Sequence, residues 1–356
     1  MGGGVTAQPI VLAAGGTGGH MVPASVLADE LARRGRRVVL FSDARGMGLP
    51  GVFQGVEAHR LASGSPSRGG VSALPATVIG IARGVMGARA QLRRLGASIV
   101  VGFGGYPSLP ALVAALALGL PTVIHEQNAV LGRVNRLLST RVDRIATSYP
   151  AVGRLAPPLA GKVRLTGNPV RPEIAAIGPA RATPLSVFVI GGSQGASILS
   201  RIVPGAIARL GRPVHVTQQC READLVAVRA IYHQANIAAD LAPYFQDVPD
   251  RLGSANLVIA RAGASTIAEL TASGRASILV PLPSAMDDHQ TANARALAEG
   301  GGAVLISERE FTTDRLFAEL NALTPDRLMA MAQGARDAGR PGAAAALADV
   351  ILETIE

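Results

Sequence analysis

The sequence has one cysteine, Cys220, no tryptophan, and only 3% aromatic residues. A single cysteine excludes an intramolecular disulfide and a metal site built from several cysteines, and it fits a reducing, cytoplasmic setting. The scarcity of aromatic rings argues against a nucleic-acid binder, because bases of single strands stack on such rings. We therefore expect no nucleic-acid partner.

Long hydrophobic runs and a signal peptide are also missing. The longest apolar run, residues 109–121, is shorter than the ~20 residues that a membrane-spanning helix needs. The opening residues, MGGGVTAQ, lack the charged and then apolar pattern of a secretory signal. We expect a protein that is soluble or lies on a membrane without crossing it.

Lysine is nearly absent, whereas arginine and glycine are abundant. Lys162 is the one lysine among 34 basic residues, and the formal net charge is +9. This excess favours acidic partners such as phosphates or an anionic membrane surface. The 42 glycines predict many tight turns, and 356 residues are enough for two domains.

Short apolar runs alternate with helical stretches along the chain. The expected strands are IVLAA, RRVVLF, SIVVG, PTVIHE and VDRIAT, followed by LSVFVIGG, PVHVTQ, NLVIAR and ASILVP. Helices are expected between them, among others at 18–34, 107–119, 196–210, 264–273 and 288–299. This alternation predicts an α/β protein with parallel sheets and helices on both faces.

The two halves of the chain share one pattern: a strand, a glycine-rich turn and a helix. The turns are GGTGG at 15–19 and GGSQG at 191–195, and a Pro- and Gly-rich connection at 155–184 separates the halves. We place the domain boundary near residue 168. Two such domains would bind ligands in a cleft at the carboxyl ends of their strands.

Each glycine-rich turn is a candidate phosphate site, because exposed N–H groups and a helix N-terminus attract an oxyanion. The alternative is a turn that needs glycine only for its backbone conformation. A dinucleotide site is less well supported: GGTGGHM does not spell G-x-G-x-x-G, although Asp43 imitates the ribose-binding acid. A third turn, GFGGYP at 102–107, strengthens the site in the first half.

Polar residues at these strand ends are candidates for chemistry. His20 is expected in the first turn of a helix, where the dipole favours a neutral, proton-accepting imidazole; the alternative is a hydrogen bond within the turn. Glu126, in the motif HEQN, is a candidate acid or base, and Asn128 is a candidate for holding sugar hydroxyls. Glu269 has two interpretations: it forms a capping box with Thr266, or it accepts both hydroxyls of a ribose.

The last motif, MDDHQTANA at 286–294, opens another expected helix. Gln290 and Asn293 are three residues apart and should share one face of it, with His289 beside them as a site-lining or surface residue. The sequence has neither D-x-D nor H-E-x-x-H, so we expect no metal and no cofactor. Arginines, hydroxyls and helix ends would then stabilise a departing diphosphate.

Seven motifs in order make the chain similar to a known family. They are GGTGGH, GFGGYPS, HEQN, GNPVR, GGSQGA, RAGASTIAEL and DDHQTANA, and they span residues 15–294. With these motifs the chain resembles the MurG family of bacterial glycosyltransferases. The resemblance implies a GT-B fold, with two Rossmann-like domains and a last helix that returns to the first domain.

The resemblance also implies the domain roles and the reaction. Residues 1–167 with the helix at 341–356 would face acceptor and membrane, and residues 168–340 would bind UDP-N-acetylglucosamine. N-acetylglucosamine would pass, with inversion, to the C4 hydroxyl of undecaprenyl-pyrophosphoryl-N-acetylmuramyl-pentapeptide in peptidoglycan synthesis. The alternative is a UDP-sugar transferase of the same fold with another lipid or small-molecule acceptor.

The family's functional residues carry over by motif. His20 and Glu126 are the catalytic candidates. Donor contacts are implied for Thr17, Gly18, Gly19, Asn128, Arg171, Ser193, Gln194, Gly195, Ala264, Ser265, Thr266, Glu269 and Gln290. Acceptor contacts are implied for Gly104, Gly105, Tyr106, His125 and Asn135. One departure is Gln246, which stands where the family usually has an aliphatic residue beside the uracil.

A lipid-linked acceptor implies docking on an anionic membrane, at the cytoplasmic face of the inner membrane, where other cell-wall synthesis proteins are expected as partners. Residues 71–95 are the best candidate surface. Their apolar residues are Leu74, Val78, Ile79, Ile81, Val85 and Met86, and their basic residues are Arg83, Arg89, Arg93 and Arg94. The alternative is an amphipathic helix packed on the first sheet.

Overall fold

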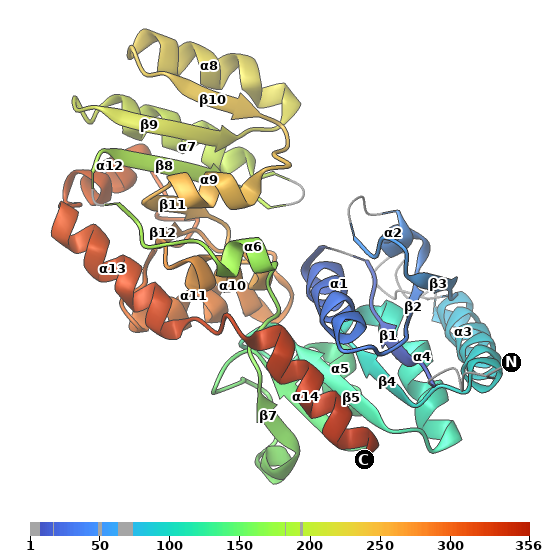
Figure 1. Ribbon diagram of the computed structural model, residues 1–356. Coiled ribbons are helices and arrows are strands. Elements are labelled where there is room, and N and C mark those ends of the chain that lie inside the picture. Colours follow the sequence, from blue (N-terminus) through green and yellow to red (C-terminus); the bar gives the residue numbers. More distant parts are fainter. Residues whose placement is uncertain (1–7, 17, 49–51, 63–73, 182, 193–194) are drawn as a thin grey trace, which may run out of the picture. The chain divides into compact units, whose positions relative to one another are not determined.

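The computed structural model describes residues 8–16, 18–48, 52–62, 74–181, 183–192 and 195–356, with side chains of the fourth range from residue 78 on. The chain forms two compact units (Figure 1). The first unit is Met1–Pro169 together with Gly342–Glu356, and the second is Val170–Pro341. Each is an α/β unit with a parallel sheet, which confirms the expected pair of Rossmann-like domains of a GT-B fold.

The first unit contains a seven-stranded parallel sheet of order β3-β2-β1-β4-β5-β6-β7. Its strands are β1 (Ile10–Ala13), β2 (Val38–Ser42), β3 (Glu57–Arg60), β4 (Ile99–Gly102), β5 (Thr122–Glu126), β6 (Arg144–Thr147) and β7 (Val163–Leu165). Its helices are α1 (Gly18–Arg33), α2 (Ala44–Met47), α3 (Leu74–Leu95), α4 (Gly105–Leu118), α5 (Arg133–Leu138) and α14 (Ala343–Ile355). The central strands β1 and β4 are buried along their whole length, because helices cover both faces of such a sheet.

Alternate residues of β1 show the two cores of this unit. Val11 and Ala13 belong to a core on the α3 and α4 side, whereas Ile10 and Leu12 belong to a core with α1 and α14. The helix α4 ends at Gly119, whose φ of +67° lies in the left-handed region that glycine adopts without strain.

The second unit contains a six-stranded parallel sheet of order β10-β9-β8-β11-β12-β13. Its strands are β8 (Leu185–Ile190), β9 (Val214–Gln219), β10 (Ala239–Ala242), β11 (Leu257–Ala260), β12 (Ala276–Leu279) and β13 (Ala303–Leu305). Its helices are α6 (Pro172–Ala175), α7 (Ser197–Ala208), α8 (Leu225–Gln234), α9 (Val248–Ser254), α10 (Ala264–Ser273), α11 (His289–Glu299), α12 (Thr313–Asn321) and α13 (Pro325–Ala338).

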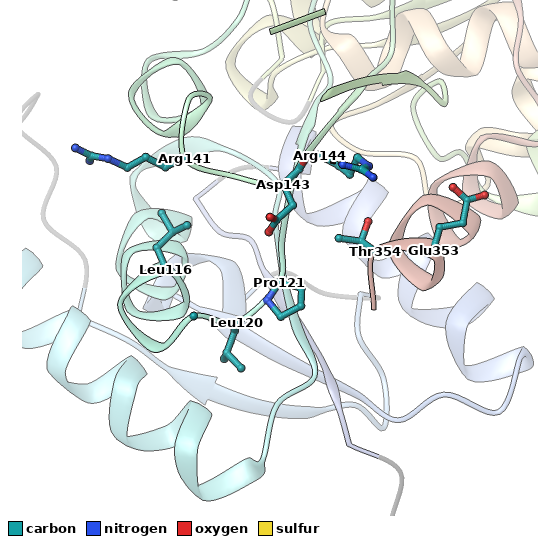
Figure 2. A pocket seen from close by; sticks show the side chains of 9 residues that line it. Leu116, Leu120, Pro121, Arg141, Asp143, Arg144, Glu353 and Thr354 are labelled. Atoms are coloured by element: carbon teal, nitrogen blue, oxygen red, sulfur yellow. Dashed lines mark hydrogen bonds between the residues drawn. The ribbon is translucent and has the colours of Figure 1, made fainter. Parts of the chain in front are cut away.

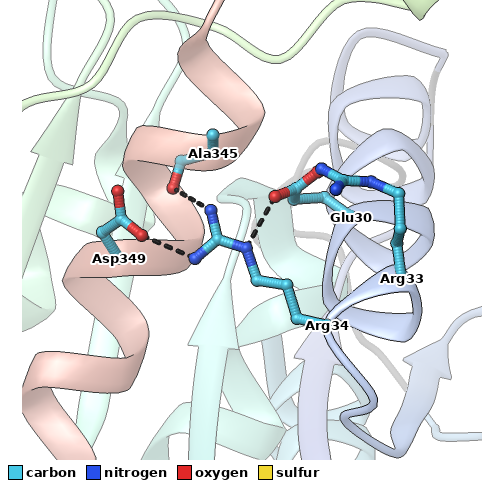
Figure 3. A network of polar contacts seen from close by, with 5 residues as sticks. All are labelled: Glu30, Arg33, Arg34, Ala345 and Asp349. Carbon is cyan, nitrogen blue, oxygen red and sulfur yellow. Dashed lines mark hydrogen bonds and ion pairs between the residues drawn. The ribbon is translucent and has the colours of Figure 1, made fainter.

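The last helix, α14, packs against α1 within the first unit. Leu347 and Ile351 are completely buried there. Arg34, which follows α1, also links the two helices. It donates to Asp349 at 2.5 Å and to the carbonyl of Ala345 at 3.2 Å, both on α14, and to Glu30 on α1 at 2.6 Å (Figure 3). The chain therefore returns to its first unit after completing the second.

The expected connection at 155–184 is more structured than its composition suggested. It contains a 3-10 helix (Pro157–Lys162), strand β7 and helix α6. Strand β7 pairs with β6 and so extends the first sheet by one strand. The proline and glycine content indicated turns, and it gave no sign of this edge strand.

Candidate functional site

The expected site residues follow the strands, at the carboxyl-end edge of each sheet. In the first unit they come after β1, β4 and β5, which are neighbours in the sheet. In the second unit they come after β8, β11 and β12, which are also neighbours, except Arg171, which is the N-cap of α6. The two units are described separately below.

The first glycine-rich turn is packed against two partners. A Cβ on Gly15 would lie 2.6 Å from Pro107 Cβ and 2.7 Å from Asp43 Oδ1, so only glycine fits. Asp43 Oδ1 accepts from the N–H groups of Gly16 (3.0 Å) and Gly46 (2.9 Å). Asp43 therefore shapes the turn and caps α2, rather than imitating a ribose-binding acid.

The less crowded part of this turn is the start of α1. Gly18 begins the helix, and a Cβ on it would meet no atom of the described chain within 4 Å. Gly19 follows in the first helical turn. Thr17 lies outside the described residues.

His20 is the third residue of α1, so its expected place in the first helical turn is correct. Its Nδ1 lies 3.1 Å from Gln127 Oε1. The ring packs on the turn before α4: a Cβ on Gly105 would lie 3.3 Å from His20 Nε2, and one on Gly104 would lie 3.6 Å from Cε1. Both glycines have positive φ, +80° at Gly104 and +70° at Gly105. Any other residue would be strained at these backbone angles.

His125 is completely buried at the end of β5. Its Nε2 lies 2.9 Å from the carbonyl oxygen of Gly167, and its Nδ1 lies 3.0 Å from Gln127 Nε2. Burial lowers the pKa of His125 to about 4, so the ring is neutral near pH 7. Gln127 thus links the two histidines; it was not among the expected site residues, although it stands inside HEQN.

Glu126 is buried and its oxygens are engaged by four donors. Oε1 accepts from the backbone and side-chain nitrogens of Asn128 at 3.0 and 3.2 Å. Oε2 accepts from Gly132 N and Asn135 Nδ2, both at 2.8 Å. Glu126 therefore holds the loop between β5 and α5 in shape, together with Asn128 and Asn135. Tyr106, in the first turn of α4, is half-buried against the neighbouring core.

The second glycine-rich turn, after β8, is held by a residue that the sequence did not single out. Gln219 accepts from Gly191 N at 3.1 Å and donates to the carbonyls of Gly192 (3.3 Å) and Pro243 (3.1 Å). Gly195 has a φ of +67° and lies against Arg221. Ser193 and Gln194 lie outside the described residues.

The capping-box interpretation of Glu269 is wrong. Helix α10 begins at Ala264 with Gly263 as its N-cap, so Thr266 lies inside the helix and Glu269 is its sixth residue. The Glu269 side chain instead faces Arg171, with Oε1 3.4 Å from Nη2. Burial raises the pKa of Glu269, and the guanidinium of Arg171 only partly opposes this effect.

The first turn of α10 contains Ala264, Ser265 and Thr266, all half-buried. The hydroxyl of Ser265 is buried and has no hydrogen-bond partner among the described residues. Together with Glu269 and Arg171, this turn forms a polar surface on α10 and α6. An unpaired buried hydroxyl is a candidate for satisfaction by a ligand.

Gln290 and Asn293 do share one face of α11, and both bond the main chain of Ala262. Gln290 Oε1 accepts from Ala262 N at 3.2 Å and from Leu282 N at 3.0 Å. Asn293 Nδ2 donates to the carbonyl of Ala262 at 3.2 Å. These residues therefore fix the loops after β11 and β12. His289 is half-buried, and its Nδ1 lies 2.7 Å from the carbonyl oxygen of Met286.

Gln246 is exposed, whereas its neighbour Phe245 is buried. The Phe245 ring meets Phe188 edge to face at 6.0 Å, and the guanidinium of Arg251 lies 4.5 Å above it. The segment is therefore anchored by Phe245, and Gln246 is presented to solvent.

A hollow of about 380 Å³ lies at the opposite edge of the first sheet, where β5 and β6 begin (Figure 2). It contains none of the expected site residues. Its charged lining comes from Arg141, Asp143, Arg144 and Glu353. Asp143 is already used there, because it accepts from the N–H and hydroxyl of Thr122 at 2.8 and 3.0 Å.

Helix α3 has one packed and one exposed face. Ile81, Val85, Ala88 and Leu92 pack against the first unit's core, so Ile81 and Val85 were wrongly assigned to a membrane-facing surface. Val78, Ile79 and Met86 are 63%, 53% and 72% exposed. Arg83, Arg89, Arg93 and Arg94 are exposed as well. The side chain of Leu74 lies outside the described part.

Two kinds of feature are absent from the described residues. Within them, no helix combines the length and apolar character needed to cross a membrane. No three His, Cys, Asp or Glu side chains in the described ranges come together as a metal site would require.

Comparisons with known proteins agree with this architecture. Residues 10–147 match the glycosyltransferase family 28 N-terminal domain, and residues 186–347 match its C-terminal domain. A Nitrobacter hamburgensis protein named UDP-N-acetylglucosamine–N-acetylmuramyl-(pentapeptide) pyrophosphoryl-undecaprenol N-acetylglucosamine transferase is 49% identical, over 98% of this chain and 97% of its own. The Paramagnetospirillum magneticum protein of the same name is 48% identical, over 98% of both chains.

Solved structures give the same result. The crystal structure of Acinetobacter baumannii MurG superimposes with a TM-score of 0.80, at 29% identity, over 97% of this chain and 99% of that one. Os79 from O. sativa, crystallised with UDP, has a TM-score of 0.71 at 13% identity over 98% and 99% of the chains, which shows a shared fold alone. On the sequence identity, the two domain matches and the fold, this chain belongs to the MurG family of glycosyltransferase family 28.

Proposed function

We propose that this chain transfers N-acetylglucosamine from UDP-N-acetylglucosamine to undecaprenyl-pyrophosphoryl-N-acetylmuramyl-pentapeptide, the lipid I to lipid II step of peptidoglycan synthesis. The observation that carries this function is the identity of 49% with a transferase of that name, over nearly the whole of both chains. The attacking group would be the C4 hydroxyl of the muramic sugar, and UDP would leave from the opposite face of the donor sugar.

The second unit is our candidate for the donor site. Glu269 is a half-buried carboxylate in helix α10 beside Arg171, and a carboxylate is well suited to accept both hydroxyls of a ribose. The turn after β8, with Ser193, Gln194 and Gly195, would offer N–H groups to the diphosphate. Arg171 would add charge stabilisation as the diphosphate departs. Ala264, Ser265, Thr266 and Gln290 would complete this donor site.

The first unit is our candidate for the acceptor and the base. His20 lies where a helix dipole favours the neutral imidazole that a base requires. We choose His20 over Glu126, because the Glu126 oxygens already hold four donors. Gly104, Gly105, Tyr106, His125 and Asn135 would line the acceptor, and Thr17, Gly18, Gly19 and Asn128 would reach the donor.

The acceptor's polyprenyl chain stays in the bilayer, so the enzyme must work at the membrane surface. We assign this docking to the exposed face of α3, with Val78, Ile79 and Met86 beside four arginines. The corresponding location is the cytoplasmic face of the inner membrane, where other cell-wall synthesis proteins would be neighbours.

The test is a transfer assay with purified protein and radiolabelled UDP-N-acetylglucosamine. A lipid-linked muramyl-pentapeptide should be glycosylated, whereas a sterol or a small aglycone should not. Transfer only to such other acceptors would replace this function by another UDP-sugar transferase activity. Chelation of divalent ions should leave the rate unchanged, and recovery of lost activity by magnesium or manganese would contradict a metal-free mechanism.

A further inference from the structure

His20 is linked to the buried interior of the first unit through Gln127 and His125. The chain of contacts runs from His20 Nδ1 to Gln127 Oε1 (3.1 Å), from Gln127 Nε2 to His125 Nδ1 (3.0 Å), and from His125 Nε2 to Gly167 O (2.9 Å). Donor and acceptor roles along it depend on histidine tautomers and on the orientation of one amide. Two backbone carbonyls determine those roles, because a carbonyl oxygen only accepts.

The first carbonyl is that of Gly167. Since it only accepts, the proton of His125 is on Nε2. His125 is completely buried and its pKa is lowered to about 4, so its Nδ1 carries a lone pair near neutral pH. That lone pair needs a donor, which identifies the Gln127 atom facing it as Nε2.

The second carbonyl is that of His125, and it orients Gln127 whatever the state of the imidazole. Gln127 Nε2 lies 3.1 Å from His125 O. An amide oxygen at this position would face another oxygen with no hydrogen between them. The amide is therefore oriented with Nε2 toward β5 and Oε1 toward His20.

His20 Nδ1 must then donate, because the Gln127 oxygen accepts only. In the neutral ring this leaves the lone pair on Nε2. That atom lies beside the amino end of α4, as its 3.3 Å distance from a Cβ on Gly105 indicates. The amino ends of α1 and α4 both disfavour the imidazolium, which keeps the lone pair available.

We propose that Gln127 is a positioning residue: it fixes His20 as the Nδ1–H tautomer, with Nε2 as the proton acceptor, while His125 and Gly167 hold Gln127 in place. This inference rests on the proposed function. In the transfer step, His20 Nε2 takes the proton of the acceptor hydroxyl as its oxygen bonds to the anomeric carbon. The bond from that carbon to the UDP oxygen breaks, and its electron pair leaves with UDP.

Nuclear magnetic resonance of protein with ¹⁵N-labelled histidine tests the tautomers in the unmodified chain. His20 and His125 signals are identified by their loss in H20A and H125N. At neutral pH we expect opposite tautomers: His20 protonated at Nδ1 and His125 protonated at Nε2. A His20 ring protonated at Nε2 overturns the proposal, whether or not any variant folds.

Two substitutions test the role of Gln127 in turnover. Gln127→Met removes all three side-chain hydrogen bonds described above at similar volume, so we expect kcat to fall by about tenfold or more, below the ~10⁴-fold cost of an enforced wrong tautomer in a serine protease. The KM for the donor should stay within about twofold, since a positioning residue does not bind the donor. Gln333→Met, at an exposed site on α13, is the matched control and should change neither.

Gln127→Glu places a negative charge at His20 Nδ1 and favours the imidazolium. The acid limb of the kcat profile should therefore move to higher pH by about one unit or more. His125 also acts on His20, but its pKa is about 4, so its titration does not produce a shift near neutral pH. An unchanged kcat in Gln127→Met, or an unmoved acid limb in Gln127→Glu, contradicts the inference.

Failure of the proposed function has a different signature. If wild-type protein does not glycosylate the lipid-linked muramyl-pentapeptide but shows the two opposite tautomers, the transferase assignment fails and the tautomer assignment stands. If wild-type protein transfers the sugar and His20 is protonated at Nε2, the transferase assignment stands and the tautomer assignment fails.

Discussion

At the scale of single residues, Glu269 is a half-buried carboxylate that faces the guanidinium of Arg171. Its pKa is raised by burial, and Arg171 compensates only in part. Ionising a carboxylate whose folded-state pKa is raised costs stability as the pH rises through that pKa. We infer that this site is kept at some expense of stability for the sake of its ligand.

Glu269→Gln should therefore raise the melting temperature of the free protein at pH 7. The gain should vanish as the pH falls below the ordinary carboxyl pKa of about 4.3, where Glu269 is protonated in both folded and unfolded chains. UDP affinity should fall at least about tenfold, because charge-assisted hydrogen bonds are worth ~1.5–3 kcal/mol each. Calorimetry and thermal melts measure both; Glu222→Gln, at an exposed site, is the control.

A second outcome would assign Glu269 a structural role alone. Unchanged UDP affinity together with a lower melting temperature would mean that the carboxylate only stabilises α10 and its pairing with Arg171.

Variants of His20 and Glu126 should differ in kcat and in stability. His20→Ala is expected to lower kcat by ~10²–10⁴-fold with little change in the donor KM, since a general base acts in the transition state. Glu126→Gln replaces one acceptor oxygen by a donor that faces other donors, so we expect a lower melting temperature first of all. A normally stable Glu126→Gln with a kcat as low as that of His20→Ala would make Glu126 the base.

Residue patterns predicted the strand ends at which the candidate residues lie, but not the side chains that hold those turns and loops in shape. HEQN and RAGASTIAEL were recognised, and so was the first-turn position of His20. Gln127 and Gln219 were missed, because a glutamine that bonds distant backbone groups leaves no signal at fixed spacing. Glu269 was open to two interpretations, and its neighbour Arg171 decided against the capping box. Asp43 was interpreted as an imitation of a ribose-binding acid, and its bond from Gly16 N shows instead that it holds the turn.

At the scale of elements, the strands that the sequence missed are the four edge strands β3, β7, β10 and β13. They are short and partly exposed, whereas central strands such as β1 and β11 are buried throughout. An edge strand needs no continuous apolar run, because one side of it meets solvent or loops. Strand β7 was missed for this reason too: it is an edge strand inside the Pro- and Gly-rich segment 155–184, which was interpreted as a connection.

The exposed face of α3 provides a prediction about membrane binding. Changing Val78, Ile79 and Met86 to serine should weaken binding to anionic vesicles without loss of stability, since these side chains face solvent. Changing Arg83, Arg89 and Arg93 to glutamate should weaken it roughly hundredfold, at ~1 kcal/mol per arginine. Vesicle co-sedimentation at low and high salt measures both effects, and salt should weaken wild-type binding.

Val85→Ser is the matched control on the same helix. Val85 packs on the core, so this change should lower the melting temperature but leave vesicle binding by the folded protein intact. Wild-type vesicle binding by both surface variants would place the docking surface elsewhere.

At the scale of the whole molecule, the two units differ in how they close their cores. The main core cluster of the second unit runs from Leu185 to Met331 and lies wholly inside Val170–Pro341. One core of the first unit needs α14, whose Leu347, Ala348 and Ile351 are completely buried with residues of α1 and the sheet. The first unit is therefore incomplete until the end of the chain has been made.

Cutting the chain at its unit boundaries should expose this asymmetry. A fragment of residues 170–341 should fold alone and bind UDP within about tenfold of the full chain, if the second unit holds the donor as proposed.

Residues 1–169 alone should lose ~3–6 kcal/mol of folding free energy from the missing Leu347 and Ile351, at ~1.5–3 kcal/mol per side chain. That loss is comparable with the whole stability of a typical domain, about 5–15 kcal/mol. Joining 342–356 to that fragment by a flexible linker should restore a cooperative melt. Circular dichroism and calorimetry measure both properties, and a folded 170–341 fragment that ignores UDP would contradict our placement of the donor site.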